Sequence, residues 1–284
     1  EANRKWIYVE QDATAIGVNR PIDVPLVGDL RGVVPQLVRA LKDTPRPPAA
    51  GLAAFMRDGQ AELDALAEES LTRSDGRGNL PIHTSRFVVE ATKAFPADGI
   101  MIRDGGATVV FQWTYSQCKP HDVIWNQNFG HIGTGLPYAT GAMLADRAAT
   151  GRQRPGMLLT SDSSFLFHIA ELETAARCKL PLVCVVGVDN QWGLEVGVYK
   201  RTFGEGTAET GTHWSKDVRL DKVAEGFGCH GEYVTTADEI RPAIERAYAS
   251  GKVGVVHVVI DPKANSEEMP KYDKFRTWYA EGTQ

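Results

Sequence analysis

The strongest constraint on the fold is an alternation of helical and extended patterns that begins near Ser85 and continues to Ile260. The periodicity predicts helices over 86–95, 135–148, 168–178, 221–227 and 238–249, and strands over 99–103, 157–160, 182–188, 232–234 and 253–260. Strands separated by helices of this length form βαβ units, in which the strands are parallel. The sequence therefore predicts an α/β fold, a doubly wound and mostly parallel sheet with helices on both faces.

The first 83 residues differ from this pattern. Residues 6–10 and 22–27 resemble short strands, and Asp29 is a plausible N-cap for an amphipathic helix. A proline-rich segment, TPRPPAA, separates this region from a second helical stretch at 52–72. We therefore divide the chain into 1–43, a linker and helix at 44–83, the α/β domain at 84–262, and a C-terminal tail at 263–284, a possible lid.

Composition excludes several classes of protein. The net charge of −5 gives no basic surface for nucleic acid, and no apolar run reaches the roughly 18 to 20 residues that span a bilayer. The N-terminus has no signal-peptide pattern. Four cysteines without C-x-x-C spacing favour reduced thiols and a cytoplasmic location over a zinc site or a disulfide framework.

Two polar loops follow predicted neighbouring strands. Ser161 to Ser164 come after the strand MLLT. Ser163 and Ser164 can cap a helix that begins near His168, and the free N–H groups of that helix attract an anion. Asp162 repels a phosphate directly but can hold it through Mg²⁺. Asn190 lies 28 residues later, one crossover on, so its amide oxygen is expected to reach the same metal, with the Trp192 carbonyl as a third oxygen.

A third loop, N-F-G-H-I-G-T-G-L-P at 128–137, is glycine-rich and precedes a helix. Glycines let a backbone approach a ligand closely, and Ile132 is the only large apolar side chain between them. Taken singly, these residues are more often turn, cap or core residues. Their order and spacing favour a binding site.

With these three motifs the chain resembles the thiamine-diphosphate decarboxylase and acetolactate-synthase superfamily over residues 84–262, and 1–43 resembles the end of its middle domain. The family pattern is G-D-G, about 25 to 30 residues, then N-N, with the glycine loop upstream. The resemblance implies Mg²⁺ ligands at Asp162, Asn190 and Trp192, an apolar wedge at Ile132, and a Gly130 carbonyl bonded to the aminopyrimidine. It implies thiamine diphosphate contacts at Ala107, Thr108, Gly130, His131, Ile132, Ser161, Asp162, Ser163, Ser164, Asn190, Trp192, Gly193 and Leu194.

The sequence departs from the family in two respects. Serines at 161 and 163 replace the two glycines of G-D-G, and Asp189 replaces the first asparagine, so the serines fit only at negative φ. The glutamate that activates the cofactor belongs to a pyrimidine-binding domain, and residues 1–80 are too short to contain it. The chain is therefore expected to be inactive alone, with the missing half a second polypeptide or an omitted or cleaved N-terminal segment, in an oligomer that is at least dimeric.

Within the superfamily, the segments closest to a known subclass are D-G-G-A-T at 104–108, N-Q-W-G-L-E-V-G-V-Y-K-R, and the tail around Lys271, Lys274, Arg276, Trp278 and Tyr279. They resemble bacterial 2-hydroxyacyl-CoA lyases, which implies an acyl-CoA substrate and a nucleotide-binding role for the tail. Glu195 is expected to transfer protons, with Tyr199 and His131 near the substrate. An acetolactate synthase, a 2-oxoacid or oxalyl-CoA decarboxylase, and a non-catalytic regulatory homologue are the alternatives.

Three of these interpretations have a plainer alternative. His131 and His168 are more often hydrogen-bonded structural residues than catalytic ones. Glu195 can equally be a solvated loop charge. Trp278 and Tyr279 are more often packing residues that fix a C-terminus than parts of a lid.

Overall fold

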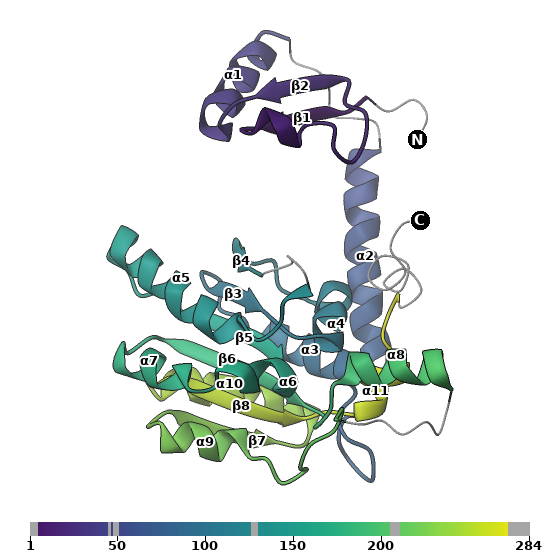
Figure 1. Ribbon diagram of the computed structural model, residues 1–284, viewed down its shortest axis with the longest axis vertical. Coiled ribbons are helices and arrows are strands. Elements are labelled where there is room, and N and C mark those ends of the chain that lie inside the picture. Colours follow the sequence, from purple (N-terminus) through teal and green to yellow (C-terminus); the bar gives the residue numbers. More distant parts are fainter. Residues whose placement is uncertain (1–4, 45–46, 48–50, 126–129, 205–210, 272–284) are drawn as a thin grey trace. The chain divides into compact units, whose positions relative to one another are not determined.

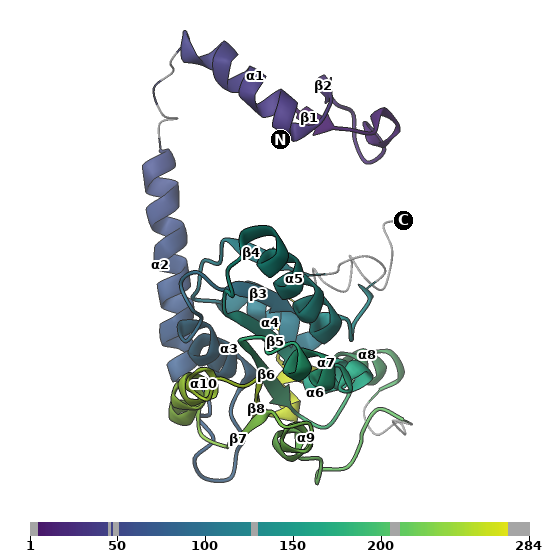
Figure 2. The same ribbon diagram turned by 90° about the vertical axis from the view of Figure 1, so that its left-hand side faces the viewer.

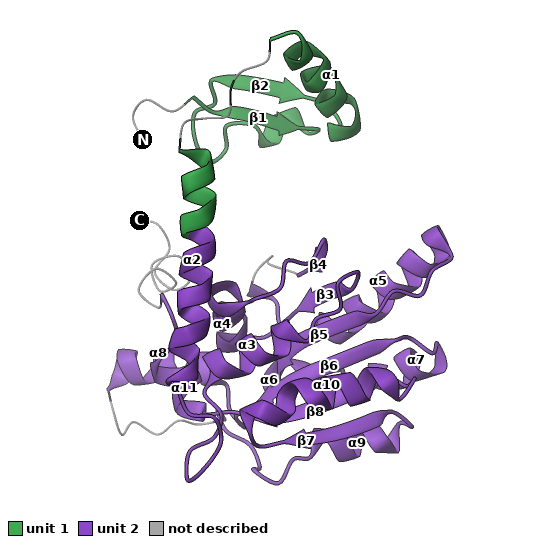
Figure 3. Cartoon of the chain, turned by 180° about the vertical axis from the view of Figure 1, so that it is seen from behind, with its two compact units in different colours: residues 1–58 green, residues 59–284 purple. Residues whose placement is uncertain are grey.

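The computed structural model describes residues 5–44, 47, 51–125, 130–204 and 211–271. The chain divides into two compact units, residues 1–58 and 59–284, coloured separately in Figure 3. Helix α2 (Leu52–Leu71) contains the boundary between them. None of the helices in the described ranges is both long and apolar enough to cross a membrane.

Unit 1 contains strands β1 (Ile7–Glu10) and β2 (Val24–Val27), which pair in parallel, a short 3-10 helix (Ala13–Ala15) and helix α1 (Leu30–Lys42). The predicted cap is confirmed, since Asp29 accepts a hydrogen bond of 2.7 Å from the Arg31 N–H. No described residue of this unit is fully buried. A two-stranded sheet with one helix is too small for a core of its own.

Unit 2 is built on a six-stranded sheet in the order β4-β3-β5-β6-β8-β7, in which every pairing is parallel (Figure 1). Its strands are β3 (Ile100–Arg103), β4 (Asp122–Ile124), β5 (Gly156–Ser161), β6 (Leu182–Val188), β7 (His230–Val234) and β8 (Gly254–Val259). The two central strands β5 and β6 are buried along their whole length. Continuous apolar runs are what such positions require.

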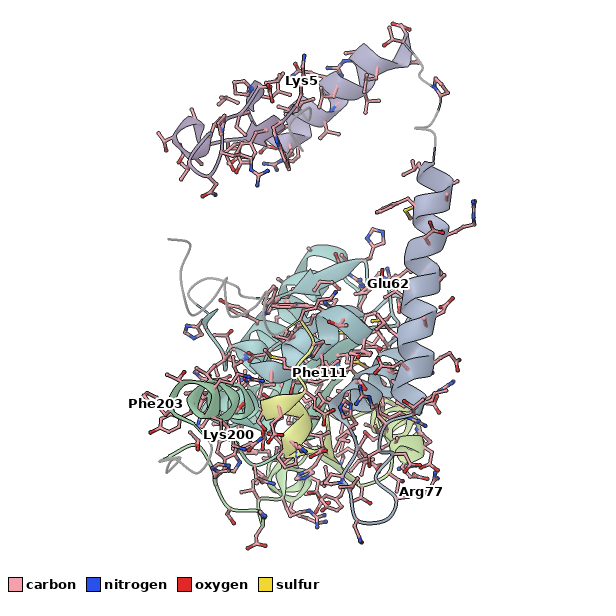
Figure 4. All side chains as sticks on the ribbon, turned by 90° about the vertical axis from the view of Figure 1, so that its right-hand side faces the viewer. Lys5, Glu62, Arg77, Phe111, Lys200 and Phe203 are labelled. Carbon is pink, nitrogen blue, oxygen red and sulfur yellow. The ribbon has the colours of Figure 1, made fainter. Side chains whose placement is uncertain are left out.

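Helices cover both faces of this sheet (Figure 2). One core contains residues of α3 (Thr84–Lys93), α4 (Ala107–Tyr115) and α10 (Ile240–Ala249), including Phe111, labelled in Figure 4. The other contains residues of α5 (Gly135–Thr150), α7 (Glu171–Arg177) and α9 (Leu220–Gly226). Consecutive strand residues alternate between the two cores, as Met157 and Leu158 do. The predicted fold class is confirmed.

Several elements differ from the expectation. The helix predicted at 168–178 is shorter, because α6 (Asp162–Phe165) and a 3-10 turn (Leu166–His168) precede α7. Helices α4, α8 (Gly193–Phe203) and α11 (Pro262–Glu267) and strand β4 are additional. The segment expected to be a tail from 263 therefore begins as a helix.

Candidate functional site

The candidate site lies at the carboxyl ends of β3, β5 and β6, which are neighbours in the sheet. This is where parallel α/β sheets bind ligands. A pocket at this edge is lined by nine residues that the sequence predicts, namely Ala107, Thr108, Ile132, Ser161, Ser163, Trp192, Gly193, Leu194 and Glu195. It is also lined by Gly106, Asp189, Gln191 and Asn265, which were not predicted.

Asp162 is the first residue of α6 and is fully buried. Its Oδ1 accepts a hydrogen bond of 2.8 Å from the Ser163 N–H, and its Oδ2 accepts one of 2.8 Å from the Asn190 N–H. The predicted adjacency of the two loops is thus confirmed, and it follows from the pairing of Ser161 with Gly187 in the β5–β6 register. Burial, and then the charge of Asp189, hold the pKa of Asp162 well above its ordinary value.

The predicted serine caps are wrong, because the helix begins at Asp162 and not near His168. The Ser163 hydroxyl lies 2.9 Å from that of Ser161, and α6 has no side-chain cap. The Ser164 hydroxyl is buried without a hydrogen-bond partner. Neither Ser161 nor Ser163 has a positive φ, so serine fits where the resembling family has glycine.

Asn190 has a φ of +57°, a left-handed conformation that asparagine tolerates better than most residues. Its carbonyl accepts a hydrogen bond of 3.1 Å from the Trp214 N–H. Its side-chain Oδ1 is buried with no hydrogen-bond partner. A buried acceptor without a partner is costly, so this atom is suited to a ligand or a cation.

The Trp192 carbonyl accepts a hydrogen bond of 2.8 Å from the Val196 N–H at the start of α8. A carbonyl oxygen has a second lone pair, so this bond leaves it able to coordinate a metal. Together with Asp162 and the Asn190 amide it makes a set of hard oxygen donors, which is the chemistry that Mg²⁺ prefers. The residues present therefore fit a divalent cation.

Asp189 is the second buried carboxylate of the site, with 7% of its surface exposed. Burial raises its pKa, and hydrogen bonds from Asn265 and Gln191 oppose that rise. Two buried carboxylates side by side repel one another, and a cation between or beside them removes that repulsion. The pair of Asp162 and Asp189 thus has the electrostatic character of a cation site.

The glycine loop is fixed by Asp104, which sequence reasoning did not include among the site residues. Its buried carboxylate accepts hydrogen bonds from the N–H groups of Gly105 at 2.7 Å, Gly133 at 3.0 Å and Gly135 at 2.8 Å. A Cβ on Gly135 would lie 2.7 Å from the Cβ of Asp104, so only glycine fits there. Burial raises the pKa of Asp104, and these three donors oppose the rise. Ile132, in this loop, is half-buried and lines the pocket.

The histidines near the loop have different environments. His168 Nδ1 lies 2.7 Å from the Gly133 carbonyl, which confirms its interpretation as a hydrogen-bonded structural residue. His131 is exposed and, like Gly130, is not among the residues lining the pocket. Gly130 has a φ of +60°, a conformation for which glycine is favoured.

Two helices begin at the pocket without a side-chain cap. Helix α4 begins at Ala107 after Gly106, and the hydroxyl of Thr108 in its first turn is buried with no hydrogen-bond partner. Helix α8 begins at Gly193, followed by Leu194. Free N–H groups at helix N-termini bind anions. The pocket therefore combines free backbone N–H groups with a set of oxygen donors, a combination that suits a metal-bound diphosphate.

Glu195 and Tyr199 lie on α8 rather than on a loop, four residues and one turn apart on one helix face. Glu195 lines the pocket and is exposed, and desolvation by the surrounding protein raises the pKa of its carboxyl. The Tyr199 ring packs 4.7 Å from that of Phe203, labelled near the end of α8 in Figure 4, and does not line the pocket.

Some predicted residues lie outside the described ranges. They are Asn128 and Phe129 of the glycine loop, and Lys274, Arg276, Trp278 and Tyr279 of the C-terminal segment. Lys271 is the last described residue.

Sequence comparisons match residues 104–258 to the family "Thiamine pyrophosphate enzyme, C-terminal TPP binding domain". The chain is 30% identical to a probable acetolactate synthase of Mycobacterium bovis, over 87% of this chain and 48% of that protein. It is 25% identical to 2-hydroxyacyl-CoA lyase 1 of Mus musculus, over 93% and 46%, and 27% identical to oxalyl-CoA decarboxylase of Escherichia coli, over 94% and 45%.

A solved structure of benzoylformate decarboxylase from Polynucleobacter necessarius superposes with a TM-score of 0.65 at 19% identity, over 92% of this chain and 45% of that one. At this identity the likeness shows a shared fold. The chain spans about half the length of the curated relatives it matches. The family match covers more than half of the chain and contains the Asp162 and Asn190 loops. The chain therefore belongs to the thiamine pyrophosphate enzymes and contains their C-terminal cofactor-binding domain.

Proposed function

We propose that this chain is the diphosphate- and magnesium-binding half of a carbon–carbon lyase that cleaves a 2-hydroxyacyl-CoA to formyl-CoA and an aldehyde or ketone, and catalyses the reverse condensation. The observation that carries the cofactor part is the pairing of Asp162 with Asn190, whose Oδ1 is buried without a partner beside two uncapped helix N-termini. The acyl-CoA part is supported by the likeness to 2-hydroxyacyl-CoA lyase 1 of Mus musculus.

In this proposal Asp162, the Asn190 amide oxygen and the Trp192 carbonyl hold Mg²⁺ on the diphosphate. The first turns of α4, α6 and α8, which contain Ala107, Thr108, Ser163, Ser164, Gly193 and Leu194, would donate hydrogen bonds to the diphosphate. Ser161 lines the same pocket. Ile132 supports the bent form of the cofactor as an apolar wedge, with Gly130 and His131 at its aminopyrimidine end.

When bound, the cofactor supplies a carbanion nucleophile that later accepts the electron pair released by the breaking bond. The bond that breaks joins the thioester carbonyl carbon to the hydroxyl-bearing carbon. A base must take the hydroxyl proton, and an acid must return a proton to the carbon that becomes the formyl group. Glu195 serves both steps, since burial raises the pKa of its carboxyl, and a carboxyl with a raised pKa holds a proton more readily and can return it. Tyr199 contacts the substrate from the next turn of α8.

The active site is completed by a pyrimidine-binding domain outside these residues, either a separate chain or an N-terminal half of the same protein. The coverage of about half of each relative supports this view. Residues 1–43 then represent the end of a middle domain, 44–83 a linker and helix, 84–262 the diphosphate-binding domain and 263–284 a C-terminal segment that contacts the nucleotide. Pairing of domains makes the assembly at least a dimer.

An acetolactate synthase is the second candidate, because the probable acetolactate synthase of Mycobacterium bovis is 30% identical to this chain. An oxalyl-CoA decarboxylase is a third. The complete assembly, supplied with thiamine diphosphate and Mg²⁺, separates them by substrate. We expect formyl-CoA from a 2-hydroxyacyl-CoA. Turnover of pyruvate without formation of formyl-CoA would favour a synthase over the lyase. Absence of any cofactor binding would favour a non-catalytic homologue.

A further inference from the structure

Helix α11 packs against α8, the helix that follows the candidate metal loop at 189–192 (Figure 1). Two glycines one turn apart, Gly193 and Gly197, make this approach possible. A Cβ on Gly193 would lie 2.7 Å from the Cβ of Asn265, and a Cβ on Gly197 would clash with the carbonyl oxygen of Ser266. The close contact shows that α11 is a fixed part of the site and not a loose C-terminal extension.

Asn265, on α11, is 3% exposed and lies between the side chains of Asp189 and Thr84, which are also buried. Its Nδ2 donates a hydrogen bond of 2.8 Å to Oδ2 of Asp189, and its Oδ1 accepts one of 2.9 Å from the Thr84 hydroxyl at the start of α3. A carboxylate can only accept, and the Thr84 hydroxyl donates to the amide oxygen. Because a hydroxyl can donate or accept, it is the Asp189 carboxylate that determines that the amide nitrogen of Asn265 faces residues 189–192.

A second residue ties the same loop to α11. Gln191 Nε2 donates to the Pro262 carbonyl at 2.7 Å and lies 3.3 Å from Oδ2 of Asp189. The residues on both sides of Asn190 are thus held from α11, while the Asn190 N–H bonds to Asp162. Asn190 has a left-handed φ, so the direction of its side chain depends on how its two neighbours are fixed.

We propose that Asn265 is a positioning residue for the metal site: by binding the Asp189 carboxylate from α11, it directs the Asn190 amide oxygen toward the cation. The inference rests on the proposed thiamine diphosphate and Mg²⁺ site. Partners behind metal ligands commonly contribute about 10- to 100-fold to metal affinity. This role requires a hydrogen-bond donor at position 265 and an acceptor at position 189. It can therefore be tested by exchanging the asparagine and the aspartate between the two positions.

The test measures Mn²⁺ binding by electron paramagnetic resonance, in saturating thiamine diphosphate, on the full chain in its native assembly. Asn265→Asp has the same size but places a carboxylate against Asp189, and we expect about 10- to 100-fold weaker Mn²⁺ binding. Ser266→Ala is the matched control, because this buried hydroxyl on the same helix bonds only to carbonyls of α11. We expect it to leave Mn²⁺ affinity unchanged.

The double variant Asn265→Asp/Asp189→Asn reverses the donor and the acceptor and is expected to recover most of the lost affinity. Such a rescue would show that the hydrogen bond between positions 265 and 189, and not the identity of either side chain, sets the Mn²⁺ affinity. Equal Mn²⁺ affinity in wild type and Asn265→Asp, or a double variant as weak as the single one, would overturn the inference. Failure of the wild type to bind Mn²⁺ and thiamine diphosphate would instead overturn the proposed function.

Discussion

The Asn190 backbone N–H donates a hydrogen bond of 2.8 Å to Oδ2 of Asp162, joining two loops that are 28 residues apart. The bond places the candidate metal carboxylate beside Asn190, whose amide oxygen is buried without a hydrogen-bond partner. This hydrogen bond holds the Asn190 loop against the proposed metal ligand Asp162. The first prediction therefore concerns Asp162.

Replacing Asp162 by asparagine keeps the size of the side chain but removes its charge. We expect thiamine diphosphate binding in Mg²⁺ to weaken by more than the roughly 10- to 100-fold that outer contacts contribute, because the proposed ligand set loses its only negative charge. Isothermal titration calorimetry measures the change. Asp238→Asn, at an exposed position, is the control. Unaltered binding in Asp162→Asn would show that the metal is held elsewhere.

Cofactor and metal are expected to stabilise the folded chain together. A ligand that binds only the folded state at 100 times its Kd adds about 2.7 kcal/mol to the free energy of unfolding. Thermal unfolding should therefore shift upward with thiamine diphosphate plus Mg²⁺ and return on addition of a chelator. The shift should be absent in Asp162→Asn. A shift that survives the chelator would contradict metal-dependent binding.

Asp104→Asn tests the anchor of the glycine loop. The amide has one acceptor oxygen where the carboxylate uses two to accept from three N–H groups, so at least one buried donor loses its partner. We expect a loss of about 1 to 3 kcal/mol in the free energy of unfolding and weaker cofactor binding, because Ile132 moves with the loop. Chemical denaturation measures the first effect. The control is Asp98→Asn, at an exposed carboxylate.

Glu195→Gln keeps the shape of the side chain and removes the proton transfer. We expect kcat of the complete enzyme to fall about 10²- to 10⁴-fold, with little change in cofactor affinity. Because the surroundings raise the pKa of Glu195, the rate of a step that uses its carboxylate should rise with pH through that raised value. The variant should lose this rise. A variant with wild-type kcat would leave Glu195 as a solvated charge.

His257 predicts a pH dependence of stability. It is 2% exposed and accepts a hydrogen bond from the Leu220 N–H, and burial lowers its pKa to about 4. The unfolded chain binds a proton near pH 6.5, whereas the folded chain does so only near 4, so stability falls as pH decreases through this window. Relative to His257→Gln, the wild type should lose about 2 kcal/mol between pH 7.5 and 5.

The comparison with His257→Gln uses urea denaturation at each pH. It is needed because Asp162 and Asp189 have raised pKa values and shift stability in the opposite direction in the same window. These carboxyls are present in both proteins, so their effect cancels in the difference. Parallel pH profiles for the two proteins would show that His257 is not buried in the neutral form.

The sequence predicted five of the six strands of the sheet and the polar residues at their ends, since a buried parallel strand is a continuous apolar run. The sixth, β4, is a short strand at the edge of the sheet and is largely exposed. Helix α4 escaped prediction because its sequence, ATVVFQWTY, is buried on almost every side and has no polar stripe. Helix α8 contains Gly193 and Gly197, which are poor helix formers and fit because α11 packs against them.

Asp104 and Asn265 could not be predicted for a different reason. Each acts on residues far away in the chain: Asp104 on Gly135, 31 residues on, and Asn265 on Asp189, 76 residues back. Although Asp104 is the first residue of the D-G-G-A-T segment, neither of these contacts is local, so only the folded arrangement shows what the two side chains bind. The residues that bind through local motifs were predicted, and those that support them from a distance were not.

The register of β5 against β6 has a consequence for how such sites can vary. Ser161 lies opposite Gly187, and Asp162 and Asn190 follow from these paired ends. The crossover between the strands, which contains α7, can lengthen or shorten without moving either residue, whereas a slip of one residue in the pairing would turn the strand over and separate them. Distant relatives with the same site should therefore be aligned from the ends of their strands, and not by the interval between aspartate and asparagine.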